Sequence, residues 1–125
     1  MHPAIRLVFV LHDHQLVGNF HDVIENAYQK SYLPFLNLLQ QHSTIRIALH
    51  TSGPLAEWLE MNHPEYLNQV SSLAAAQQIE IVGGGFSEPI LAMLPSRDRI
   101  GQIRQYNQWL EQRLQTTVTG MWIAE

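Results

Sequence analysis

The sequence predicts an α/β fold made of parallel (β/α) units that form about half of a barrel. Four apolar stretches have the composition of buried strands, and three segments of helical periodicity separate them, which is typical of a parallel sheet. Each stretch runs into polar or ionisable side chains, and parallel-sheet enzymes carry their sites at such carboxyl ends. The predicted strands cover residues 7–11, 45–49, 79–82 and 121–124.

Proline positions divide the helical segments between these strands. Segment 22–41 contains Pro34, which predicts a kink or a second helix that Pro34 opens. Segment 54–77 begins at a proline, and its sequence Asn-His-Pro at 62–64 predicts an interruption. Segment 96–114 has Ser96 as its expected cap. Its predicted buried stripe is Ile100, Ile103, Tyr106, Leu110 and Leu114.

Size and composition limit the classes of protein that this chain can represent. The 125 residues, 46% of them hydrophobic, predict one domain spanning 1–125. With 14% charged residues and a net charge of -4, nucleic-acid binding is not expected. The absence of cysteine excludes disulfides and thiolate metal sites. No run approaches the ~20 apolar residues of a membrane helix, so we expect a soluble, cytoplasmic chain without membrane contact.

Side chains alternate along a strand, and this alternation predicts which groups share a face. It places His12, His14 and His50 on one face together with Glu80 and Glu125, and turns Trp122 away from Glu125. Inward histidines and carboxylates favour a barrel over an open sheet. Half a barrel leaves edge strands uncovered, so we expect either the missing carboxyl-terminal half or a second copy as cover.

The residues alone leave the roles of these polar groups open. His12 and His14 suit hydrogen bonding to a substrate, while a metal site has no clear third ligand. Glu125 follows a strand, where barrel enzymes keep a nucleophile or a general acid, although a last residue is often a solvated end. Glu80 needs a partner if it is buried, either Arg46 or substrate hydroxyls.

Other conspicuous residues have simpler interpretations. The glycines at 83–85 lack the spacing of a nucleotide loop and predict a tight turn that lets a ligand approach the backbone. Trp58 and Trp109 fall on predicted helices and are interpreted as packing residues. The remaining histidines, His2, His21, His42 and His63, have no ligating spacing.

Taken together, these segments resemble the amino-terminal part of glycoside hydrolase family 57, most closely its 4-α-glucanotransferase and α-amylase members. The matching stretches are LHDHQLVGNF from Leu11, AYQKSYLPFL from Ala27, LHTSGPLAEWLE from Leu49, IEIVGGGFSEPILAMLP from Ile79 and GMWIAE from Gly120. They cover nearly the whole chain in the family's order, and their combination is far more specific than any one of them.

This resemblance implies a (β/α)7 barrel and a retaining mechanism on α-1,4-glucans or maltooligosaccharides, with no cofactor and no metal. Glu125 matches the family's nucleophile, and His12, His14, Glu80 and Glu88 match residues around the sugar being transferred. The family's acid/base is an aspartate beyond residue 125. We therefore expect the chain to be an incomplete catalytic barrel without turnover of its own.

Two departures from the family pattern lie beside the histidines, because Leu16 replaces a usual proline and Asp13 a common asparagine. Two other functions are compatible with the residues. One is a non-catalytic sugar-binding or assembly module. The other is a metal-dependent polysaccharide deacetylase that binds zinc or another divalent ion through His12 and His14.

Overall fold

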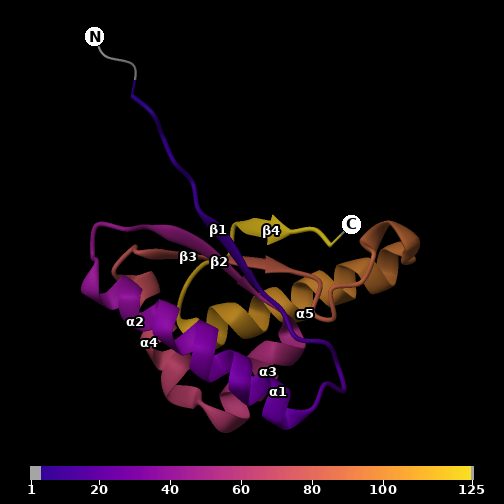
Figure 1. Cartoon of the computed structure of the whole chain (residues 1–125). Helices are drawn as coiled ribbons and strands as arrows, with labels where there is room; N and C mark the ends of the chain where they lie inside the picture. The colour runs from indigo at the N-terminus through magenta and orange to yellow at the C-terminus, as the bar shows by residue number, and fades with distance from the viewer. Residues whose placement is uncertain (1–3, 125) are drawn as a thin grey trace.

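The fold is an arc of four parallel strands in a computed structural model that describes residues 4–124. The strands are β1 (Val10–Asp13), β2 (Ile47–Thr51), β3 (Ile79–Gly84) and β4 (Gly120–Trp122), and they lie in the order β1-β2-β3-β4. Figure 1 shows this arc with the helices on one side. Parallel strands that follow one another in chain order, with every crossover helix on one face, form part of a (β/α) barrel. The predicted fold class is confirmed.

The predicted strands exist, but their boundaries differ. β1 begins at Val10 and continues through Asp13, because these residues pair with Ala48 to Thr51 of β2. The prediction of 7–11 followed the apolar run, whereas pairing with the neighbour decides where a strand lies. His12 and Asp13 are therefore strand residues.

The helices follow the predicted pattern of interruptions. Pro34 lies in the first turn of α2 (Leu33–Gln41), and the π-helical segment η1 (Tyr28–Tyr32) joins α2 to α1 (His21–Ala27). A single residue, His63, separates α3 (Gly53–Asn62) from α4 (Pro64–Ala75), as the Asn-His-Pro sequence predicted. Within residues 4–124, no helix has the length and apolar character needed to cross a membrane.

The third helical segment is α5 (Ser96–Leu114), and two details predicted for it are wrong. Ser96 is the first helical residue, and the carbonyl of Pro95 accepts the first backbone bonds, from the amides of Asp98 and Arg99. Ile100 is 47% exposed, because the amino-terminal end of α5 extends beyond the strands (Figure 1). The stripe is buried only from Tyr106 onward.

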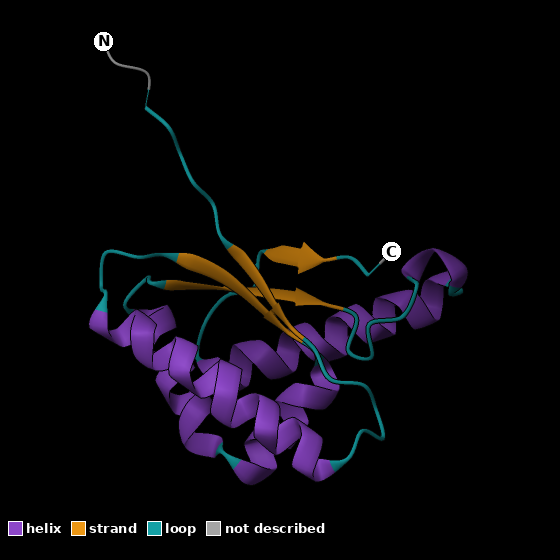
Figure 2. Cartoon of the chain, in the orientation of Figure 1, coloured by secondary structure: helices purple, strands orange, loops and turns teal. Residues whose placement is uncertain are grey.

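The core lies between the helices and one face of the sheet, and the other face is bare (Figure 2). Its most deeply buried side chains are Tyr28, Leu36, Leu39, Leu55, Leu59 and Tyr106. On the bare face, Val10 is 48% exposed although it belongs to a strand. The extended segment before β1 also exposes Leu7 and Val8. This asymmetry positions the site, because groups at the carboxyl ends of the strands open onto an uncovered surface.

Candidate active site

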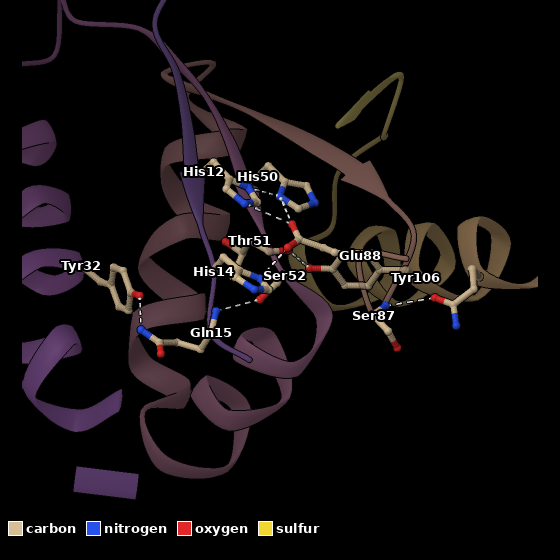
Figure 3. Close-up of polar contacts among 11 residues, drawn as sticks. His12, His14, Gln15, Tyr32, His50, Thr51, Ser52, Ser87, Glu88 and Tyr106 are labelled. Carbon is tan, nitrogen blue, oxygen red and sulfur yellow. Dashed lines mark hydrogen bonds and ion pairs between the residues drawn. The ribbon is translucent and has the colours of Figure 1, made fainter. Parts of the chain in front are cut away.

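Three histidines and one glutamate meet at the carboxyl ends of β1 and β2 (Figure 3). His12 and His50 are neighbours in the parallel register, so their side chains leave the same face of the sheet. His14 follows two residues after His12. Glu88 comes from the loop after β3. We refer to His12, His14, His50 and Glu88 as the histidine–glutamate cluster.

The carboxylate of Glu88 lies among all three imidazoles. Its Oε2 is 2.5 Å from His14 Nδ1, and its Oε1 is 3.3 Å from His12 Nε2 and 3.4 Å from His50 Nδ1. The Nδ1 atoms of His12 and His50 are 2.8 Å apart, a distance at which one donates a hydrogen bond to the other. Glu88 is 9% exposed, whereas His12 and His14 remain 28% and 32% exposed. The cluster is thus shielded from solvent at Glu88 and accessible to solvent at His12 and His14.

The backbone of Glu88 adopts an unusual conformation to reach this position. Its φ of 51° lies in the left-handed region, which costs free energy for a non-glycine residue and is often found at functional sites. A turn supports it, since the Glu88 amide donates to the carbonyl of Gly85. The loop also docks on α3, where the Gly53 amide donates to the carbonyl of Phe86 and a Cβ on Gly53 would overlap the Phe86 ring.

His50 is the most buried member of the cluster, with 1% of its side chain exposed. Burial, reinforced by His12 and His14, lowers the pKa of His50 to about 4. His50 is therefore neutral near pH 7 and can accept a hydrogen bond from His12. Alternation along β2 placed His50 on the correct face, but it was not predicted as a site residue.

The ring of Trp122 covers His12, with centroids 4.4 Å apart and planes inclined by 10°. This contact corrects the predicted orientation of β4. Trp122 pairs with Gly84 in the register, and the strand therefore turns Trp122, not Met121, toward the histidine face. The sequence prediction counted alternation from an assumed strand start and so assigned the residues of β4 to the wrong faces. The pairing of β4 with β3 decides which residues face the histidines.

Gln15 holds the segment that carries His14 and was also not predicted as a site residue. Its backbone amide donates to Ser52 Oγ, and its side-chain amide donates to the hydroxyl of Tyr32 (Figure 3). These bonds tie the loop after β1 to Ser52, which joins β2 to α3, and to η1 in the helical layer. The signal in the sequence was its position immediately after His14.

Glu80 lies on the same face as His12 and His50 but nearer the amino end of its strand. Glu80 is exposed on the bare face, so burial does not require a partner for its carboxylate. Within residues 4–124 it forms no ion pair with Arg46. Its carboxylate is directed toward Gly120, where a Cβ added to the glycine would lie 3.8 Å from Glu80 Oε1. Glu125 lies outside the described residues.

The glycines at 83 and 84 allow close packing within the chain, which corrects the predicted ligand-binding turn. Gly83 and Gly84 belong to β3. A Cβ on Gly83 would overlap Asn107, and one on Gly84 would lie 2.8 Å from the carbonyl oxygen of Trp122. The close approach at these positions is therefore made by α5 and β4.

The packing predictions for the tryptophans on the helices are confirmed. Trp58 is buried and donates to His21 Nδ1 at 3.1 Å, and Trp109 packs at the edge of the core. His63 contacts Glu25 and Glu65 on the helical side of the sheet. These histidines lie apart from the cluster.

Fold and site together define an arc of a (β/α) barrel with imidazoles and a carboxylate at the carboxyl ends of its strands. Such a constellation offers both hydrogen-bond donors and acceptors to a polar ligand, and Trp122 adds an aromatic surface. One atom each from His12, His14 and Glu88 also lies within 4.8 Å of the others, close enough to surround a cation.

Comparison with known proteins identifies the family. Residues 8–125 match the model of glycosyl hydrolase family 57. The chain is 45% identical to an α-amylase of Pyrococcus furiosus and 46% identical to α-amylase 1 of Dictyoglomus thermophilum, in each case over 100% of this chain. The crystal structure of the 4-α-glucanotransferase of Thermococcus litoralis superposes with a TM-score of 0.90 at 41% identity, over 94% of this chain. The chain belongs to glycoside hydrolase family 57.

The chain spans only a small part of these relatives. It covers 19% of the Pyrococcus protein, 18% of the Dictyoglomus protein and 18% of the chain in the Thermococcus structure. Enzymes of this family have a (β/α)7 barrel, of which the four strands described above form part. The bare face of the sheet is then the side that looks into the barrel.

Proposed function

We propose that this chain is the amino-terminal part of a retaining enzyme that hydrolyses or transfers α-1,4-linked glucans. The observation that carries the proposal is the histidine–glutamate cluster, which opens on the inner face of a barrel arc in a chain of this family. The names of the relatives, α-amylase and 4-α-glucanotransferase, support an α-glucan substrate.

In this proposal His12, His14 and Glu88 hold the sugar whose glycosidic bond is broken. Sugar hydroxyls both donate and accept, and the cluster presents imidazole nitrogens and carboxylate oxygens toward the open face. Glu80 contributes a second carboxylate on the same face. Neutral His50 accepts a hydrogen bond from His12, which keeps the His12 ring in place when a sugar binds.

Glu125 is proposed as the nucleophile that attacks the anomeric carbon and forms a glycosyl-enzyme. Glu125 follows three residues after Trp122, whose ring lies against His12. A retaining enzyme also needs a second carboxyl about 5 Å away to protonate the leaving oxygen. We propose that an aspartate in the remainder of the barrel supplies this group and that the isolated chain has negligible turnover.

Reconstitution of the barrel tests this function. Maltooligosaccharide hydrolysis and disproportionation are measured for the chain alone and mixed with the carboxyl-terminal remainder of the Thermococcus litoralis enzyme. We expect activity only in the mixture, and loss by a factor of at least about 10⁴ in Glu125→Gln. Glu57→Gln, an exposed change on α3, is the matched control and should retain activity.

Two results would contradict the proposal. Activity that survives Glu125→Gln would remove Glu125 from the chemistry. An assembled mixture that binds maltooligosaccharide without turning it over would favour the alternative of a non-catalytic sugar-binding module. Assembly is checked by size-exclusion chromatography before each assay, so that lack of association is not mistaken for lack of catalysis.

A further inference from the structure

The histidine–glutamate cluster contains the ligand set of a transition-metal site. The sequence offered His12 and His14 without a third ligand, and the loop after β3 supplies it as Glu88. One atom from each of the three side chains lies within 4.8 Å of the others. Two imidazoles and one carboxylate are the protein ligands of many zinc and non-haem iron sites, which leave further positions open.

Two buried atoms of the cluster lack an aligned hydrogen-bond partner. Among residues 4–124, His14 Nδ1 and Glu88 Oε1 are both without one, and the Glu88 side chain is only 9% exposed. His14 Nδ1 is near Glu88 Oε2, but the contact is not aligned as a hydrogen bond. A buried carboxylate oxygen without a partner is costly, so the cluster has unfilled capacity for a cation.

The surroundings of His12 match those of a metal-binding histidine. A ligating imidazole typically donates its other ring N–H to a neighbouring acceptor, which fixes the tautomer. His12 Nδ1 is 2.8 Å from Nδ1 of His50. When His12 donates this hydrogen bond, its Nε2 presents a lone pair toward Glu88 Oε1, 3.3 Å away. Two acceptors then face each other, and a metal ion between them would bind both.

We propose that His12, His14 and Glu88 form a binding site for one divalent transition-metal ion, with zinc as the best match. Small side-chain adjustments bring the three atoms to the ~2.0–2.2 Å that zinc requires. The partly exposed rings of His12 and His14 leave an entry from the bare face and room for a water ligand. If the proposed function is correct, zinc and the sugar use the same atoms and exclude each other.

Zinc binding to the chain alone tests the site without any glucan. Metal-stripped protein is titrated with zinc sulfate by calorimetry, and bound metal is measured by elemental analysis after gel filtration. We expect one zinc ion per chain, with affinity reduced at least about tenfold in both His14→Ala and Glu88→Gln. His42→Ala removes an exposed histidine away from the cluster and should bind zinc like the unchanged chain. Far-UV circular dichroism verifies that each variant is folded.

The outcomes separate the metal site from the proposed function. Absence of zinc binding, or binding that persists in both cluster variants, overturns the metal site and leaves the reconstitution experiment unaffected. Binding that disappears in both cluster variants and remains in His42→Ala supports it, even if the reconstituted barrel proves inactive. In an active mixture, added zinc should slow turnover and excess maltooligosaccharide should restore it. Turnover that zinc leaves unchanged would refute the exclusion.

Discussion

Asp13 gives the sharpest prediction about stability, because its carboxyl is partly buried on the side of β1 away from the histidines. Burial raises the pKa of Asp13 from 3.8 to about 6. Its surroundings include Tyr32 and Tyr66. Within residues 4–124, no side chain donates a hydrogen bond to its carboxylate. The charge is therefore uncompensated once Asp13 ionises.

The pKa shift sets both the sign and the magnitude of the effect. Since the folded chain binds the proton more tightly than the unfolded chain, stability falls as pH rises from about 4 through about 6. A difference of about two units corresponds to about 3 kcal/mol. Asp13→Asn keeps the shape and removes the charge, so its gain in unfolding free energy should be about 1 kcal/mol at pH 4.5 and about 3 kcal/mol at pH 7.5.

Urea unfolding followed by circular dichroism measures this gain at both pH values. Asp22→Asn is the matched control, because Asp22 is exposed in the first turn of α1 and its replacement should change stability by only a few tenths of a kcal/mol. A gain for Asp13→Asn that does not increase between pH 4.5 and 7.5 would refute the reasoning. So would destabilisation at pH 7.5.

Two substitutions test how the strands and α5 are held beside the site. Gly84→Ala should destabilise the chain by about 2 kcal/mol or more, because the new Cβ would lie 2.8 Å from the backbone oxygen of Trp122 and the φ of 154° is unfavourable. Urea unfolding measures this, and a neutral result would show that β4 can move away freely. Tyr106→Phe should cost about 1 to 2 kcal/mol in the same assay, because the buried hydroxyl donates to the carbonyl of Thr51. An unchanged unfolding free energy would mean that this bond contributes nothing.

Much of the fold follows from local patterns in the sequence. Apolar runs separated by helical periodicity predicted four parallel strands, and the prolines at 34 and 64 predicted where helices begin. These features depend on backbone geometry within a few residues, so they can be read without knowing the neighbours. Alternation also placed His12 and His50 together correctly.

Part of the site followed only from a resemblance. His12 and His14 stood out as polar groups at a strand end, but Glu88 lies in a loop whose side-chain direction no periodicity predicts. Matching it to a family motif indicated its role, and the tertiary structure shows how it reaches the histidines. A left-handed backbone at Glu88 and docking of Phe86 on Gly53 aim its carboxylate at them.

The sequence by itself determined the element types, their order and the candidate polar groups. Only the tertiary structure decided which of these groups touch. The phase of β4, and with it the stacking of Trp122 on His12, depends on pairing with β3. His50 and Glu80 lie on the same face, and His50 is buried because His12, Glu88 and Trp122 lie against it, whereas Glu80 remains exposed. Pairing, burial and loop docking join residues far apart in the chain, so local patterns carry too little information to predict them.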